Sequence, residues 1–125
     1  MPQPLTIRVN EVVGSELCIA SDDGQKVHDR LAEALRAGRN VCLSFLNVDS
    51  LTSAFLNAAV GQLYAEFSED EVRSKLSVSE MGEDDLALLK RVVEAAKAYF
   101  QNPREFEEAR KEVLGEDDDD GGPGN

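Results

Sequence analysis

The feature that most constrains the fold of this chain is a change in hydrophobic periodicity just before its midpoint. Val41, Leu43 and Phe45 alternate with less apolar residues, a pattern that predicts an inner strand with one strongly apolar side. From Phe55 to Phe67 the apolar residues recur instead at helical spacing, which predicts a mostly buried helix. The chain therefore passes from a buried strand to a buried helix through the short polar segment between them.

That polar segment places hydroxyl and carboxylate side chains at the start of the helix, namely Asp49, Ser50, Thr52 and Ser53. A helix start presents unpaired N–H groups and the positive end of the peptide dipole, so such side chains are favoured there as caps. A phosphorylated hydroxyl would be bound by the same N–H groups, and it would add negative charge to an exposed turn. Capping and phosphorylation are thus two interpretations of the same residues.

The remaining patterns predict one α/β domain over residues 1–115. Alternation from Leu5 to Asn10, a Gly14-Ser15 break and the apolar run 17–20 predict a first hairpin. Further elements are predicted as helices at 21–38, 83–100 and 103–115 and as a fourth strand at 75–79. The order ββαβαβαα predicts a small mixed four-stranded sheet with helices packed on it, and its strand–helix–strand passages favour parallel pairing.

The charge of the chain limits its partners. The formal net charge is -12 at pH 7, which argues against DNA or RNA and favours basic or neutral protein surfaces. Residues 116–125 combine an acidic run with GGPGN and are predicted to be a disordered tail. No segment approaches the roughly 18 apolar residues of a membrane span, and residues 1–10 lack a signal-peptide pattern. We therefore expect a cytoplasmic protein without a membrane partner.

The residue types that carry catalysis or bind metals are sparse. Cys18 and Cys42 lie in apolar strand patterns without zinc-ligand spacing, and we expect buried, reduced thiols, although the sequence leaves a disulfide between them open. The single histidine, His28, lies within a predicted helix and is expected to be solvated. No Gly-rich phosphate loop or nucleophile motif occurs. The sequence therefore predicts no catalytic residue, no metal and no cofactor, and the protein is not expected to be an enzyme.

The residues around the strand–helix turn resemble a known family. Gly38 followed by an apolar strand, then FLNV at 45–48 and LTSAFL at 51–56 leading to Gly61-Gln62-Leu63, is similar to the STAS-like family of unassigned function. The resemblance covers roughly residues 9–101. That family looks like a shortened relative of the STAS domain, the module of bacterial anti-sigma factor antagonists and of the cytosolic tails of sulfate transporters.

The resemblance bears on the phosphorylation hypothesis. In the anti-sigma factor antagonists a kinase phosphorylates the second serine of an Asp-Ser-Ser-Gly turn at this helix start. Aligning Leu51 with the apolar residue before that turn sets Thr52, Ser53, Ala54 and Phe55 against its four residues. Ala54 lacks the hydroxyl of the usual acceptor, so the resemblance implies Ser53, and after it Thr52, as the nearest substitutes.

The resemblance also implies a function. It implies a non-enzymatic regulatory module that binds a histidine-kinase-like ATPase or an anti-sigma factor through the turn and the outer side of the helix that follows. The implied partner-binding residues are Asn47, Asp49, Ser50, Thr52, Ser53 and Phe55. A structural or self-assembling subunit, using a sheet edge or the last two predicted helices, is the alternative, and the sequence leaves the oligomeric state open.

Overall fold

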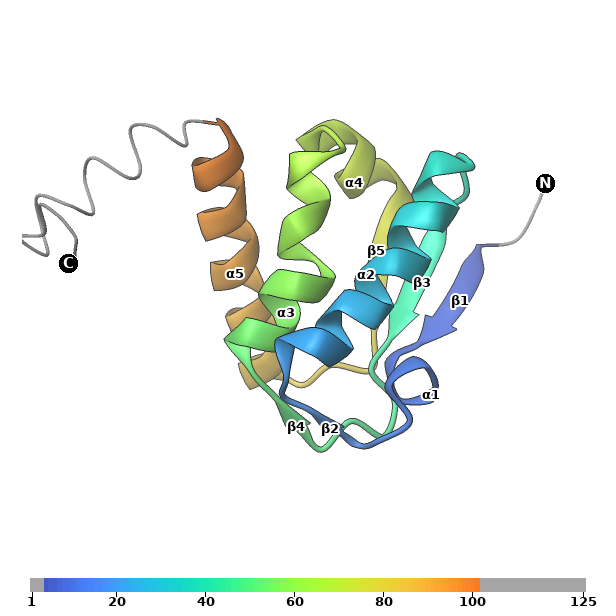
Figure 1. The fold of residues 1–125 in the computed structure, drawn as a ribbon, viewed down its shortest axis with the longest axis vertical. Coiled ribbons are helices and arrows are strands. Elements are labelled where there is room, and N and C mark those ends of the chain that lie inside the picture. The colour runs from blue at the N-terminus through green and yellow to red at the C-terminus, as the bar shows by residue number, and fades with distance from the viewer. Residues whose placement is uncertain (1–3, 102–125) are drawn as a thin grey trace, which may run out of the picture.

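A computed structural model of the chain describes residues 4–101, in which short strands and helices alternate (Figure 1). The strands are β1 (Leu5–Arg8), β2 (Leu17–Cys18), β3 (Val41–Ser44), β4 (Ser50–Leu51) and β5 (Leu76–Ser79). The helices are α1 (Val9–Val13), α2 (Ser21–Arg36), α3 (Ser53–Ala59), the 3-10 helix η1 (Gly61–Ala65), α4 (Glu69–Lys75) and α5 (Glu83–Gln101). The helix predicted at 103–115 and the tail predicted at 116–125 lie outside the described residues.

The main sheet has three parallel strands in the order β1-β3-β5, so β3 is the inner strand that the apolar alternation predicts. The register lines up equivalent residues across the sheet, and the rows alternate between its two faces. The row Ile7, Leu43 and Val78 belongs to the apolar face, which α2 crosses (Figure 1). The neighbouring row of Thr6, Cys42 and Ser77 is more polar. One face of the sheet is thus packed and the other is not.

The predicted first hairpin and the mixed four-stranded sheet are both wrong. After β1 the chain forms the short helix α1, which ends at Gly14 with a φ of 81° and a hydrogen bond from the Gly14 N–H to the Asn10 carbonyl (2.8 Å). This helix, rather than a tight turn, connects β1 to β2, and Gly14 ends it in the left-handed conformation. β2 consequently leaves the main sheet and pairs in parallel with β4, forming a separate two-stranded ribbon. All strand pairs among the described residues are parallel, so the sheet is not mixed.

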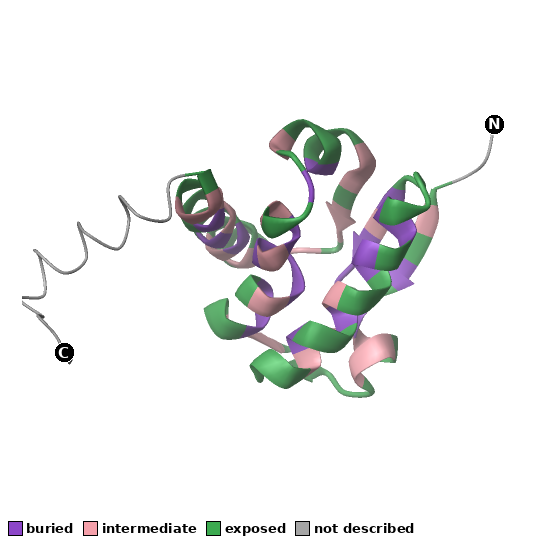
Figure 2. Ribbon diagram, turned by 45° about the horizontal axis from the view of Figure 1, so that its top comes forward, coloured by how far each residue is buried: buried purple, intermediate pink, exposed green. Residues whose placement is uncertain are grey.

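The core lies between the sheet and the helices, where buried residues gather on the facing sides of the elements (Figure 2). Helix α2 passes close to α3, because Gly24 presents no side chain toward the backbone of Phe55. The most deeply buried larger side chains are Val9, Cys18, Val27, Leu31, Val41, Leu43, Phe55, Leu56 and Leu63. The strand β3 and the helices α2 and α3, which the apolar patterns of the sequence predict, therefore all contribute to one continuous core.

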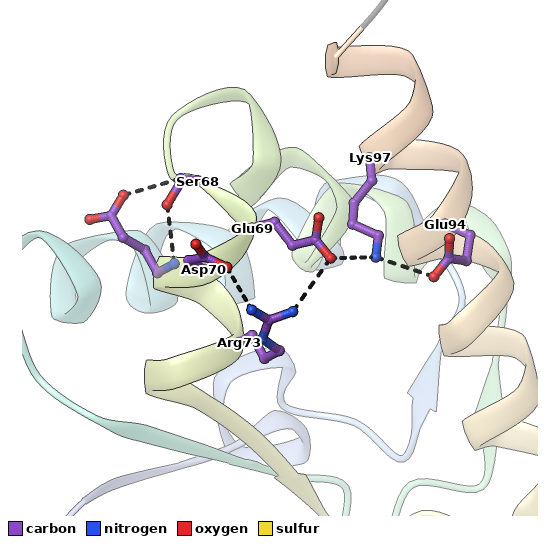
Figure 3. Close-up of polar contacts among 7 residues, drawn as sticks. Ser68, Glu69, Asp70, Arg73, Glu94 and Lys97 are labelled. Carbon is purple, nitrogen blue, oxygen red and sulfur yellow. Dashed lines mark hydrogen bonds and ion pairs between the residues drawn. The ribbon is translucent and has the colours of Figure 1, made fainter.

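Helices α4 and α5 are joined by a cluster of charged side chains (Figure 3). The Lys97 amine donates to Glu69 (2.9 Å) and forms an ion pair with Glu94 (3.2 Å), while Arg73 contacts Asp70 (2.6 Å) and Glu69 (3.9 Å). The hydrogen bond from Lys97 lowers the pKa of Glu69. The side chains of Glu69, Arg73 and Glu94 are exposed to solvent, so each of these ion pairs contributes little to the stability of the fold. The cluster links α4 to α5 through Glu69 and Lys97.

Candidate functional site

The segment between β3 and α3 is a turn that is fastened to β2. A hydrogen bond from the Val48 N–H to the Phe45 carbonyl (3.1 Å) closes the first bend, in which Asn47 has a φ of 61°. The Asp49 N–H then donates to the Glu16 carbonyl (2.9 Å), and β4 pairs with β2. The chain therefore holds a defined path along the ribbon before α3 begins, at the lower end of the view in Figure 1.

Thr52 is the N-cap of α3, which confirms the capping interpretation for this residue. Its Oγ1 accepts a hydrogen bond from the Phe55 N–H (3.2 Å) and donates one to the Ile19 carbonyl (2.6 Å). The Thr52 N–H also donates to the Cys18 carbonyl (3.3 Å). One side chain thus satisfies an unpaired N–H at the helix start and ties the helix to the end of β2.

Removing this hydroxyl should therefore destabilise the protein. We expect Thr52→Ala to lower the free energy of unfolding by about 1–2 kcal/mol, because the cap and the bond to Ile19 are lost together. Thr52→Ser keeps the hydroxyl and should retain most of that stability. Urea unfolding followed by circular dichroism measures both variants, and an alanine variant as stable as the serine variant would show that these hydrogen bonds do not form in solution.

Five of the six residues that the resemblance implies as partner-binding are at least partly accessible in the structure, and the sixth is not. Asn47, Asp49 and Ser53 are exposed, and Ser50 and Thr52 are half-buried. Phe55 is instead fully buried, with 0% of its area exposed, so it cannot contact a partner in this conformation. The reason is its place in α3, where Phe55 joins Leu56 and Ala59 on the face that packs into the core.

Apolar residues beside the turn were not identified from the sequence. Leu17 and Ile19 expose 52% and 47% of their area, and Leu46 at the tip of the turn exposes 39%. Leu17 and Ile19 are two residues apart in an extended segment and so point to the same side. Leu17 pairs with Ser50 of β4, and the Ile19 carbonyl accepts from Thr52, which follows β4. The sequence showed an apolar run at 17–20 but not which of its residues would be buried. In the structure Cys18 is the one buried residue of that run.

The cysteines and the histidine occupy ordinary structural positions. Cys18 is a buried free thiol, as expected, and burial, with a smaller effect of Asp23, raises its pKa to about 11. Cys42 is also free but only half-buried, and its Sγ donates to the Ser79 hydroxyl (3.4 Å). His28 is half-buried rather than solvated, and its Nδ1 has no hydrogen-bond partner among the described residues.

Two further searches concern only the described part of the chain. Within residues 4–101 no three His, Cys, Asp or Glu side chains gather closely enough to hold a metal ion. None of the helices in that range is both long and apolar enough to cross a membrane.

Comparison with known proteins gives one finding. A family model described as a STAS-like domain of unknown function matches residues 23–86, which is half of the chain. The matched region begins in the first turn of α2, includes the turn and α3, and ends in the first turn of α5. No curated protein and no solved structure matches this chain.

Proposed function

This chain belongs to the family of STAS-like domains of unknown function, and we propose that it is a non-enzymatic regulatory module that binds a protein partner through the turn before α3. The observation that carries the proposal is the exposed apolar pair Leu17 and Ile19 beside that turn. The likeness to anti-sigma factor antagonists supports a histidine-kinase-like ATPase or an anti-sigma factor as the partner. We call the turn surface the set Leu17, Ile19, Leu46, Asn47, Asp49, Ser50 and Ser53.

The turn surface has the composition of a protein interface. Protein interfaces combine an apolar centre, which is desolvated on binding, with a polar rim that remains near water. Leu17 and Ile19 supply exposed apolar area that a partner could desolvate, and the exposed polar residues Asn47, Asp49 and Ser53 lie in the neighbouring turn and at the start of α3. The carboxylate of Asp49 favours a partner with a basic or neutral contact surface.

Regulation by phosphorylation is proposed for Ser53 rather than Thr52. Phosphorylation of Thr52 would remove the proton that its Oγ1 donates to the Ile19 carbonyl and would disturb the cap of α3. Ser53 is exposed and lies one residue later, so its modification leaves that cap in place. Ala54 is exposed as well but offers no hydroxyl. A phosphate on Ser53 would add nearly two negative charges to a surface that already carries Asp49.

Direct binding measurements test the proposed function. The full chain is used to capture proteins from its source cells, and a histidine-kinase-like ATPase or anti-sigma factor among them is purified and titrated by calorimetry. We expect Ile19→Asp and Ser53→Glu each to raise the Kd at least about tenfold, which corresponds to about 1.4 kcal/mol. Ala98→Asp is the control. Ala98 is exposed near the C-terminal end of α5, and that end of the helix lies far from the two-stranded ribbon of β2 and β4 (Figure 1).

Two results would contradict this proposal. If Ile19→Asp, Leu17→Asp and Ser53→Glu all bind every captured partner as wild type does, the turn surface is not the binding surface. If wild type is an oligomer in light scattering and the same substitutions dissociate it, the turn surface serves self-assembly, and the alternative of a structural subunit replaces the regulatory one. Thermal unfolding of each variant shows that the fold is retained.

A further inference from the structure

The outer edge of β1 presents unused backbone hydrogen-bonding groups. β1 is an edge strand, and it pairs only with β3 among the strands of residues 4–101. The Leu5 N–H donates to the Asn40 carbonyl (2.8 Å), so Leu5 and, two residues on, Ile7 turn their backbone groups toward β3. The backbone N–H and C=O groups of Thr6 and the N–H of Arg8 therefore point the other way, toward the outer edge, whereas Arg8 is the N-cap of α1 and its carbonyl belongs to that helix.

A groove runs along this edge. It has a volume of about 440 Å³ and lies between β1 and one face of α2. Arg30, Ala34 and Ala37 line the helix side, and they recur at steps of four and three, as residues on one helical face do. Ile7 and Ala34 are buried at the base of the groove, and its accessible apolar surface comes from the half-buried Leu5 and Val12 and the exposed Ala37.

The groove is bordered by arginines in a chain that is otherwise strongly acidic. Arg8, Arg30 and Arg39 all line it, together with Glu11 and Glu33. Arg8 forms an ion pair with Glu11 (3.6 Å), whereas none within 4.0 Å is found for Arg30 or Arg39 among the described residues. Arg8 is the last residue of β1, and Arg39 precedes the Asn40 that binds the first residue of β1. Cationic side chains therefore lie at both ends of the free edge.

We propose that this groove binds an extended acidic segment of a partner protein, which adds to β1 as a further strand. The segment's backbone pairs with the N–H and C=O of Thr6 and with the N–H of Arg8, as in other cases of strand addition to a sheet edge. Side chains of an extended segment alternate in direction, so one set meets the apolar surface of Leu5, Val12 and Ala37 while carboxylates of the other set meet the arginines. The matching ligand is thus a peptide in which apolar and acidic residues alternate.

Charge separates this occupant from a second copy of the chain. In a two-fold pairing of β1 with β1, the arginines that border the groove of each copy would be brought toward those of the other. Like charges in such a position oppose association, whereas an acidic segment is attracted at both ends of the edge. The groove is also lined by none of the residues of the turn surface, so this inference does not depend on the proposed function.

A designed peptide tests the inference. The probe is a fluorescein-labelled nonapeptide in which valine and glutamate alternate, and its binding to the full chain is followed by fluorescence anisotropy. We expect saturable binding that weakens as salt is added. Arg30→Glu, Arg39→Glu and Thr6→Pro should each raise the Kd at least about tenfold, since Thr6→Pro removes an outward N–H that β3 does not use. Arg91→Glu, the same charge change on an exposed residue of α5, should leave the Kd within about twofold.

Four results would overturn the inference. Equal binding of a peptide with lysine in place of glutamate would show that the arginines do not select the ligand. Unchanged binding by Arg30→Glu, with the fold verified by circular dichroism, would place the peptide elsewhere. If wild type is a dimer that Thr6→Pro dissociates, the edge is occupied by a second copy. The fourth result uses a variant of the full chain with Asp117→Asn, Asp118→Asn, Asp119→Asn and Asp120→Asn. If it binds the peptide more than tenfold more tightly than wild type, the chain's own acidic run competes with the peptide for the groove.

Discussion

Replacing Phe55 with alanine is expected to lower the free energy of unfolding by about 3–5 kcal/mol. Phe55 is fully buried on the core face of α3, beside Leu56, and its N–H is the group that the Thr52 side chain caps. Truncation would leave a cavity beneath the turn surface that close-packed neighbours fill only in part. Urea unfolding of wild type and variant under the same conditions gives the change in stability from the midpoints and slopes.

Matched variants distinguish a core role for Phe55 from a surface one. Phe55→Leu keeps most of the buried volume and should cost less than about 1.5 kcal/mol if neighbouring side chains repack. Ile19→Ala removes an exposed side chain and should change stability by no more than about 0.5 kcal/mol. If Phe55→Ala were as stable as Ile19→Ala, the packing of α3 against the core would be wrong.

Gly24→Ala should also destabilise the protein, by about 2–3 kcal/mol. A methyl group at this position would overlap the carbonyl oxygen of Phe55 and lie 2.9 Å from the Cβ of Ala58, so α2 and α3 would have to move apart. Alanine is about 1 kcal/mol better than glycine inside a helix, and the overlap has to exceed that gain. Thermal and urea unfolding of the variant measure the net effect.

Gly82→Ala is the control for that substitution. Nothing lies within 4 Å of a Cβ built at Gly82, and its φ is not in the left-handed region, so alanine fits there without overlap. The Gly82 carbonyl accepts from the Leu86 N–H at the start of α5, a position where glycine is better than alanine, so we expect a loss of no more than about 1 kcal/mol. A Gly24→Ala variant as stable as Gly82→Ala, or more stable than wild type, would mean that α2 and α3 do not approach as closely as the structure shows.

The sequence predicts best those helices and strands whose buried side follows from the pattern of apolar residues within the element itself. In β3 the apolar Val41 and Leu43 are buried and Cys42 between them is partly exposed, although Ser44 is buried as well. In α5 the buried residues Leu89, Val92 and Ala96 recur at helical spacing, so in both cases the apolar pattern predicts the type of element. The N-cap at Thr52 follows from the same kind of local information, because a hydroxyl before a helical pattern has few other uses. Local patterns therefore predicted α2, α5 and the inner strand, whereas the single helix predicted from Phe55 to Phe67 is divided into α3 and the 3-10 helix η1, and α1 was not predicted.

The errors concern features that depend on residues far away in the chain. Val9 continues the alternation of β1 but begins α1, so no hairpin follows. Whether Leu17 or Cys18 faces the core depends on the pairing of β2 with β4, about thirty residues later. Phe55 belongs to the apolar stripe that predicts a buried helix, and it was placed among the partner-binding residues only by the resemblance; in the structure it packs into the core, where α2 comes close at Gly24. The groove beside β1 likewise requires a strand, a helix and the residues after it to meet.

The parallel register of the sheet has a consequence for how the chain folds. Leu5 pairs with Val41 and Val41 with Leu76, so each partner strand lies about thirty-five residues further along. Closing loops of that length lowers the conformational entropy of the chain before any hydrogen bond between the strands has formed. Among the described residues no two strands that are consecutive in the sequence pair with each other, so every strand pair requires such a loop. We therefore expect the local hydrogen bonds within the helices to form before the sheet, and strand pairing to limit the folding rate.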